Sequence, residues 1–248
     1  MSLVTVKDVK RSFGGIRALD GCSMHVERGA IEGLIGPNGA GKTTLMNVIT
    51  GYERVDDGRI ELDTRDITNR SPDTIAAAGV GRTFQITRVF PRLSLLENIH
   101  VAWPQPGLRN ELRSWSSEAE REEALDLLGF VGLGTLADHP AETLSHGQKK
   151  LLEFALVLSS RPELVLLDEP ASGINPSLLR TLVRRIREMN SRGVTFLVVE
   201  HDMEFVMSLC ERVTVMDRGR VIAVGTPEET RKNRAVVDAY LGTDLVYE

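Results

Sequence analysis

The chain has 248 residues, of which 42% are hydrophobic and 26% are charged, and this composition is typical of a globular protein with a sizeable core. Its 30 basic and 35 acidic residues give a formal net charge of −5. A nucleic-acid-binding protein usually needs a basic surface to displace counterions from phosphates, so the charge disfavours that class and we expect no nucleic-acid partner.

Two further features of the sequence indicate the compartment. The N-terminus has no basic stretch followed by an apolar run, and no window approaches the ~18 to 20 consecutive apolar residues that span a bilayer. Cys22 and Cys210 lie in separate apolar segments and match neither a disulfide framework nor a metal-binding CxxC motif. We expect a soluble intracellular protein with two buried free thiols.

The first sixty residues predict four strands and one helix. The strands are expected at Leu3–Val9, Cys22–Val26, Ala30–Ile35 and Gly58–Leu62, with a break at Gly14-Gly15. The helix is expected from about Lys42 to Thr50, because Gly51 follows at the position where glycine commonly ends a helix. The strands on either side of Gly14-Gly15 favour an antiparallel arrangement, whereas the third strand and the helix form one strand–loop–helix unit.

A glycine-rich loop joins the third strand to this helix and matches the pattern GxxxxGK[ST] without a mismatch. It consists of Gly36, Pro37, Asn38, Gly39, Ala40, Gly41, Lys42, Thr43 and Thr44. In such a loop, backbone N–H groups and the positive end of the following helix face a bound phosphate. Lys42 supplies charge to the β- and γ-phosphates, and Thr43 supplies a hydroxyl to Mg²⁺. Because a strand precedes the loop and a helix follows it, we interpret it as a phosphate-binding loop and not as an ordinary turn.

Helix signals dominate the middle of the chain. Ser94 with Glu97, and Ser117 with Glu120, have the spacing of a capping box, in which side chains bind free N–H groups at a helix start. We therefore expect a helical subdomain over about residues 86–160.

Strands alternate with helices after residue 160. Strands are expected at Leu164–Leu167 and Thr195–Val199, a helix from Asn175-Pro176 to about Asn190, and a hairpin over Val213–Val224 that turns at Arg218-Gly219. The alternation predicts an α/β protein whose parallel sheet is covered on both faces.

Two carboxylates follow the first of these strands. Ligands of an open α/β sheet bind at the carboxyl ends of its strands, so Asp168 and Glu169 are expected beside the phosphate-binding loop. Asp168 is placed to hold the magnesium shell, and Glu169 to polarise a water for in-line attack on the γ-phosphate. The alternative is an acidic turn after a core strand, and the loop favours the hydrolytic interpretation.

Four further motifs occur in a fixed order around these sites. They are Arg82-Thr83-Phe84-Gln85, Leu144-Ser145-His146-Gly147-Gln148, Ser172-Gly173-Ile174-Asn175 and Glu200-His201-Asp202. They resemble the Q-loop, the LSGGQ signature, the D-loop and the switch histidine of the ATP-binding cassette (ABC) family. With Phe13, the resemblance extends from Phe13 to His201.

The resemblance implies the ABC ATPase fold, an α/β P-loop NTPase core with a mostly parallel sheet, an N-terminal antiparallel β lobe and a helical subdomain. It implies a single ATP-binding domain over residues 1–248. The expected parts are a nucleotide-binding core at about 1–85 and 161–225, a helical signature subdomain at about 86–160 and a C-terminal helical tail at about 226–248.

The resemblance also implies a role for each motif. His201 is expected to contact the γ-phosphate, Gln85 to sense Mg²⁺ and the attacking water, and Phe13 to stack on adenine. Without the resemblance, His201 and Gln85 would be ordinary surface residues and Phe13 a core residue at a strand end. The implied catalytic residues are Glu169, His201 and Gln85, the implied Mg²⁺ ligands are Thr43, Gln85 and Asp168, and the nucleotide is ATP.

The signature residues are expected to act on a second subunit. Ser145 has the position of a helix cap, which by itself is only a structural feature. In the ABC family, this helix contacts the γ-phosphate held by the other subunit, so that two chains enclose two ATP molecules head to tail. The implied contacts are Ser145, His146, Gly147 and Gln148. His146 replaces the usual glycine, a variation that occurs within the family.

Finer features resemble the ATPase subunits of branched-chain amino acid importers. They are Arg82–Gln85, Glu200–Met203 and the tail Ala239–Gly242. The implied partners are a second ABC ATPase subunit, two transmembrane permease subunits and an extracytoplasmic solute-binding protein, with the chain peripheral on the inner face of the cell membrane. The apolar and basic segment Ile86–Pro91 is expected to dock a permease helix or, alternatively, to pack within the subdomain.

Other functions stay open at this point. The ATPase of a urea or amide importer and that of a lipopolysaccharide-export complex resemble the same subfamily. A soluble ABC ATPase of DNA repair would need a long coiled-coil insert before the signature, and a ribosomal one usually carries two cassettes, which this chain lacks. An unrelated P-loop kinase or GTPase would not contain the signature.

Overall fold

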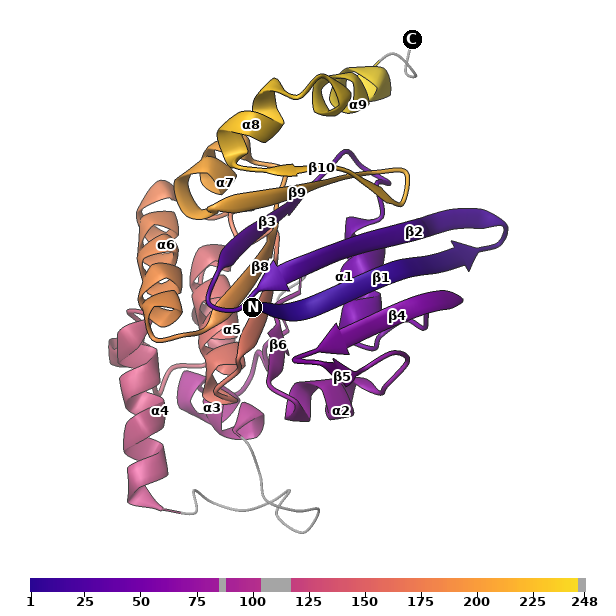
Figure 1. Cartoon of the computed structure of the whole chain (residues 1–248). Coiled ribbons are helices and arrows are strands. Elements are labelled where there is room, and N and C mark those ends of the chain that lie inside the picture. The colour runs from indigo at the N-terminus through magenta and orange to yellow at the C-terminus, as the bar shows by residue number, and fades with distance from the viewer. Residues whose placement is uncertain (85–87, 104–116, 245–248) are drawn as a thin grey trace.

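A six-stranded sheet forms the centre of the protein, as shown by a computed structural model that describes residues 1–84, 88–103 and 117–244 (Figure 1). Its strand order is β10-β9-β3-β8-β7-β6, and neighbours are parallel except for the β9–β10 hairpin. The strands are β3 (Ile31–Ile35), β6 (Val80–Arg82), β7 (Leu164–Asp168), β8 (Thr195–Val199), β9 (Arg212–Asp217) and β10 (Arg220–Gly225). The expected mostly parallel sheet is confirmed.

A second, antiparallel sheet forms the N-terminal lobe in the order β2-β1-β4-β5. Its strands are β1 (Ser2–Phe13), β2 (Ile16–Glu27), β4 (Asp57–Leu62) and β5 (Arg65–Asp66). Gly14 and Gly15 form the two-residue turn of the β1–β2 hairpin, with φ angles of 53° and 89° that favour glycine at both positions.

The two strands of this hairpin are longer than the sequence predicted, because their ends beyond Leu3–Val9 and Cys22–Val26 carry polar residues without a clear alternation. Ion pairs with residues distant in the chain stabilise the polar end of β1, in place of an apolar pattern. Arg11 pairs with Glu53 and with Asp56, at N–O distances of 2.9 and 3.1 Å.

Helices cover both faces of the central sheet. They are α1 (Lys42–Ile49), α2 (Pro72–Ala77), α3 (Leu95–Ala102), α4 (Glu118–Phe130), α5 (His146–Ser159), α6 (Pro176–Ser191), α7 (Met203–Leu209), α8 (Pro227–Lys232) and α9 (Arg234–Asp244). Short 3₁₀ turns lie at Gly134–Leu136 and Ala141–Thr143. In the described ranges, no helix has the length and apolar character needed to cross a bilayer.

The predicted helix caps are present. Ser94 and Ser117 each accept a backbone N–H at the start of α3 and α4, and Ser94 also forms a complete capping box with Glu97. Asn175 caps α6 and is followed by Pro176 in the first turn. These local signals could be recognised from sequence because each involves residues only three positions apart.

Alternate side chains of the central strands enter two separate cores. Leu164 and Leu166 of β7 face a core shared with α1 and the antiparallel sheet. Val165 and Leu167 face a core shared with α5, α6 and α7. The strands are therefore apolar on both faces, as expected for a covered parallel sheet.

The two cysteines lie in different cores, Cys22 in the first and Cys210 in the second. Both are buried and free, which confirms the sequence interpretation. Burial raises the pKa of each thiol to about 12, so both are protonated at neutral pH.

Asn98 of α3 organises the loop that precedes this helix. Its side chain is buried and its Nδ2 donates to the carbonyl oxygens of Phe90, Leu93 and Ser94 at 2.9 to 3.3 Å. Its Oδ1 accepts the Phe90 N–H at 2.8 Å. One amide side chain thus satisfies four backbone groups.

We expect Asn98→Ala to lower the free energy of unfolding by about 1–3 kcal/mol, because it removes the hydrogen bonds of a buried side chain and takes away the partner of the Phe90 N–H. Urea denaturation of the full chain measures this loss. Val101→Ala, at an exposed position of the same helix, serves as the control and should change stability by at most about 0.5 kcal/mol. Equal stability of Asn98→Ala and the wild type would contradict the assignment.

Candidate active site

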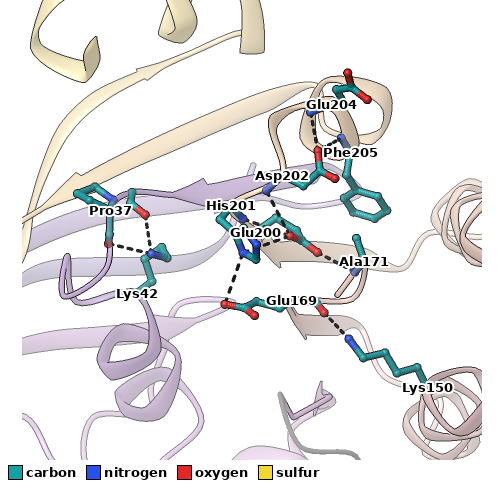
Figure 2. Close-up of polar contacts among 11 residues, drawn as sticks. Pro37, Lys42, Lys150, Glu169, Ala171, Glu200, His201, Asp202, Glu204 and Phe205 are labelled. Atoms are coloured by element: carbon teal, nitrogen blue, oxygen red, sulfur yellow. Dashed lines mark hydrogen bonds and ion pairs between the residues drawn. The ribbon is translucent and has the colours of Figure 1, made fainter. Parts of the chain in front are cut away.

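The phosphate-binding loop joins β3 to α1, as the sequence predicted. Lys42 Nζ donates to the carbonyl oxygens of Gly36 and Pro37, at 2.6 and 3.0 Å (Figure 2). Burial lowers the pKa of Lys42, and the negative charges of Glu169 and Asp168 oppose this shift. Lys42 therefore lies within electrostatic reach of both predicted carboxylates. Among the described residues, no side chain caps the start of α1, so the positive end of this helix stays available to an anion.

Two glycines of the loop are required by the strands packed against it. Gly36 has φ 155°, and a Cβ there would overlap the carbonyl oxygen of Met216 in β9. Gly41 has φ 101°, and a Cβ there would overlap the carbonyl oxygen of Ala18 in β2. The loop is thus enclosed by both sheets, which brings the antiparallel lobe next to it.

Phe13 lies at the end of β1 and is 42% exposed, unlike the core phenylalanine that the sequence allowed as an alternative. The Arg11 guanidinium lies 4.5 Å from the centre of its ring. The ring is therefore available to a flat ligand, although no contact in the described structure joins it to the phosphate-binding loop.

Asp168 ends strand β7 in a buried position. Its Oδ2 lies 3.2 Å from Arg82 Nη2, and its N–H donates to Thr83 Oγ1 at 3.1 Å. Arg82 also donates to Asn47 Oδ1 of α1 at 2.7 Å. Burial raises the pKa of Asp168, and the hydrogen bond from Arg82 opposes this rise. Arg82 thus connects the β7 carboxylate to the helix that follows the phosphate-binding loop.

Glu169 directs its carboxylate toward the side of the site where Lys42 and His201 lie (Figure 2). Its Oε1 lies 3.7 Å from Nδ1 of His201, which follows β8. Its N–H donates to the carbonyl oxygen of Val199 at 2.9 Å, and its φ is 46°, in the left-handed region. The carboxyl ends of β3, β7 and β8 therefore bring Lys42, Asp168, Glu169 and His201 together, as the sequence predicted.

Glu200 is a site residue to which the sequence argument assigned no role. Its side chain is 1% exposed, and its carboxylate accepts the N–H groups of Ala171, His201 and Asp202 at 2.7, 3.2 and 3.5 Å. Burial raises its pKa, and these hydrogen bonds oppose the rise. Glu200 thus fixes the end of β8, which carries His201, to the segment after Glu169. The one sequence feature that could have indicated a role for Glu200 was its position directly after the apolar strand Thr195–Val199.

The signature residues begin α5. Ser145 and Gln148 form a complete capping box, in which Ser145 Oγ accepts the Gln148 N–H at 3.3 Å and Gln148 Oε1 accepts the Ser145 N–H at 3.0 Å. His146 is exposed and its ring lies against Gly173, whereas Gly147 is buried against Leu178. The first glycine of the usual signature can therefore be replaced here without a steric conflict, while a side chain at position 147 would displace Leu178.

Gln85 lies outside the described residues, together with Ile86 and Thr87. On either side of them, the backbone is held by Glu153 of α5, which the sequence argument did not identify. Glu153 Oε1 accepts the N–H groups of Phe84 and Arg88 at 3.0 and 3.5 Å. Burial raises the pKa of Glu153 to about 7.

Comparisons with known proteins agree with this geometry. The family profile described as "ABC transporter" matches residues 19–172, and that described as "Branched-chain amino acid ATP-binding cassette transporter" matches residues 220–246. The chain is 38% identical to the probable branched-chain amino acid transport ATP-binding protein LivG of Archaeoglobus fulgidus, over 98% of this chain and 96% of that protein. It is also 38% identical to the high-affinity branched-chain amino acid transport ATP-binding protein BraF of Pseudomonas aeruginosa, over 97% and 98%.

Solved structures give the same result for the fold. An ATP-binding cassette of an ABC transporter in its ADP conformation matches with a TM-score of 0.87 and 34% identity, over 98% of this chain and 99% of that one. A bacterial ABC transporter cassette solved as a dimer matches with a TM-score of 0.78 and 25% identity, over 90% and 98%.

The fold and the assembled motifs thus define a P-loop ATPase, and the chain belongs to the ABC transporter family. Within that family, it is similar over nearly its whole length to branched-chain amino acid transport ATP-binding proteins.

The raised pKa of Glu153 predicts a pH dependence of stability. A carboxyl whose pKa rises from 4.5 to about 7 on folding binds its proton more tightly in the native state, so this stabilisation is present below pH 4.5 and is lost as the pH rises through 7. Between pH 5 and 8, the wild type should therefore lose roughly 2–3 kcal/mol of stability relative to Glu153→Gln.

Chemical denaturation at a series of pH values measures this difference. Glu142→Gln, at an exposed carboxylate of the same subdomain, is the control and should show a constant difference from the wild type. A constant difference for Glu153→Gln as well would contradict the shifted pKa.

Proposed function

We propose that the chain binds and hydrolyses MgATP at a junction with a second ABC ATPase subunit, and that this reaction powers import of branched-chain amino acids through separate membrane permeases. The observation that supports the proposal most directly is the arrangement of Lys42 opposite Asp168 and Glu169 at the carboxyl edge of one sheet. This edge is where an α/β sheet receives its ligands.

The phosphate-binding loop would receive the triphosphate. Lys42 would exchange the carbonyl oxygens of Gly36 and Pro37 for the β- and γ-phosphate oxygens, while the loop N–H groups and the start of α1 bind the remaining charge. Phe13 would stack on the adenine. The proposed nucleotide-binding residues are Phe13, Gly36, Pro37, Asn38, Gly39, Ala40, Gly41, Lys42, Thr43 and Thr44.

Thr43, Gln85 and Asp168 would hold Mg²⁺. The described residues contain no cluster of three or more His, Cys, Asp or Glu side chains suited to a metal. This fits Mg²⁺ bound with a nucleotide, which takes few protein ligands and keeps phosphate oxygens and waters in its shell. Bound in this way, Mg²⁺ supplies positive charge against the β- and γ-phosphate oxygens.

Glu169 would act as the general base. Its carboxylate accepts a proton from the water whose oxygen attacks the γ-phosphorus in line, while the bond from that phosphorus to the ADP oxygen breaks. His201 lies beside Glu169 and would bind a γ-phosphate oxygen. Gln85 would orient the water. Glu200 holds the backbone at His201 and thereby supports this arrangement.

The signature would complete the pocket of a second subunit. Ser145 and His146 are exposed at the start of α5, so the positive end of this helix is open to a γ-phosphate bound elsewhere. Ser145, His146, Gly147 and Gln148 are the proposed contacts. The matching cassette that was solved as a dimer supports the pairing of two cassettes.

A groove in the helical subdomain suits a permease helix. It is lined by Arg82, Phe84, Arg88, Phe90, Asn98, Val101, Ala102, Glu153, Leu156 and Val157. Phe90 and Val101 are apolar and more than half exposed, and Arg88 adds positive charge. The groove forms where the helical subdomain, at about 86–160, meets the nucleotide-binding core, at about 1–85 and 161–225. Its occupancy would keep the chain on the inner face of the membrane, opposite an extracytoplasmic solute-binding protein.

The branched-chain substrate is supported by relatives and by the tail. The LivG and BraF proteins resemble this chain from end to end, and the profile of branched-chain amino acid transporters matches β10, α8 and α9. The tail at about 226–248 would therefore be the part specific to this subfamily.

Glu169→Gln should bind MgATP with wild-type affinity and lose at least about 100-fold in turnover, because the amide cannot accept the water proton. The bound, unhydrolysed ATP should hold two subunits together. Phosphate release and size-exclusion chromatography of the full chain with MgATP measure both effects. Unchanged turnover would refute the role of Glu169 as base.

Lys42→Ala should abolish nucleotide binding, which a fluorescent ATP analogue detects. Cells carrying this variant in place of the wild type should lose high-affinity uptake of radiolabelled leucine, isoleucine and valine. Lys232→Ala, at an exposed position of α8, is the control and should keep both binding and uptake. Undiminished leucine uptake with loss of urea uptake would contradict the proposed substrate.

A further inference from the structure

Lys150 of α5 is a buried cation close to the site. Its side chain is 6% exposed, and its Nζ donates to the backbone carbonyl oxygen of Glu169 at 2.6 Å (Figure 2). An ammonium group loses hydration on burial, so such a residue is rare unless its charge and donors are satisfied. Desolvation lowers the pKa of Lys150, and the carboxylates of Glu200, Glu153, Glu169 and Asp168 oppose this shift.

The backbone that Lys150 holds is in an uncommon conformation. Glu169 has φ 46°, in the left-handed region that residues with a side chain rarely adopt. Hydrogen bonds at both of its backbone groups hold it there. Its N–H donates to the Val199 carbonyl oxygen, and its own carbonyl oxygen accepts from Lys150 Nζ at 2.6 Å and from the Ser172 N–H at 3.2 Å. This conformation directs the carboxylate toward His201 and Lys42 instead of along the strand.

Lys150 lies on the helix that carries the signature. It lies five positions after Ser145, about 7.5 Å along a helix of 1.5 Å rise per residue. The intervening turn is rigid because its cap is complete and its inner face is buried. A movement of the start of α5 would therefore shift the Lys150 ammonium and its hydrogen bond to the Glu169 carbonyl oxygen.

We propose that Lys150 is a positioning residue that holds the Glu169 backbone and so links the direction of the hydrolytic carboxylate to the seating of α5 on the nucleotide of the partner subunit. The inference rests on the proposed role of Glu169 as general base. Lys150 touches neither substrate nor reacting atoms in this arrangement; it acts through the carbonyl group of Glu169.

The test uses MgATP turnover by the full chain. Lys150→Met removes the ammonium and keeps an unbranched side chain, and it should lower kcat at least about tenfold while the KM for ATP changes by less than about twofold. Lys150→Arg restores a cationic donor and should recover at least about a third of the wild-type kcat. Lys149→Met is the matched control, because Lys149 is the preceding residue of the same helix and is partly exposed; its kcat should stay within about twofold.

A double variant separates this inference from the proposed function. If Lys150 acts through Glu169, the variant with both Lys150→Met and Glu169→Gln should turn over no more slowly than Glu169→Gln alone. An additional tenfold loss in the double variant, a changed KM in Lys150→Met, or no recovery in Lys150→Arg would overturn the positioning role. Wild-type turnover by Glu169→Gln would instead refute the base, irrespective of Lys150.

Melting temperatures of all variants accompany the kinetics. A loss of kcat that tracks a loss of melting temperature across Lys150→Met and Lys150→Arg would indicate a structural role only, and would also overturn the proposal. If Lys150→Met does not fold, Lys150→Gln, which removes the charge and keeps a polar end, is measured in its place against the same criteria.

Discussion

The arrangement of the site depends on the attraction between one half-buried ammonium, that of Lys42, and two carboxylates at the same edge of a parallel sheet. Lys42 follows β3, whereas Asp168 ends β7 and Glu169 comes directly after it, with β8 between these two strands. Parallel strands place all their carboxyl ends on one side, so residues more than a hundred positions apart meet there without any local contact in sequence. These three charges are partly desolvated. The groups packed around them shield the charges from water and direct them toward the place proposed for a phosphate.

Two helices with different roles enclose this edge. The first helix is α1, which packs in the core shared with the antiparallel sheet. Its start follows the phosphate-binding loop and has no side-chain cap. The second, α5, presents a fully capped start to the outside and sends Lys150 and Glu153 inward, to Glu169 and to the backbone beside Gln85. The helix proposed to meet a second subunit thus also holds two parts of its own site, which would give a physical route for one nucleotide to influence hydrolysis of the other.

The sequence predicted those parts of the structure that are encoded locally. The strand–loop–helix unit around Lys42, the caps at Ser94 and Asn175 and the doubly apolar strands follow from short-range spacing. The buried charges could not be predicted in the same way. Lys150 lies 19 positions from its partner Glu169, and Glu153 lies 69 positions from Phe84, so each reads as an ordinary polar residue of an amphipathic helix. The sequence predicted both strands of the β1–β2 hairpin but missed their full length for a similar reason, because ion pairs with distant residues hold the polar end of β1.

The central claim, that each pocket is completed by the signature of another subunit, can be tested by photocrosslinking. Isotopically heavy Lys42→Ala chains, which retain the signature, are mixed with light wild-type chains and an ATP analogue that carries a photoreactive group on its γ-phosphate. Only the light chains hold nucleotide, and mass spectrometry should find the label on the heavy peptide that contains Ser145–Gln148. Label confined to light peptides would contradict the shared pocket.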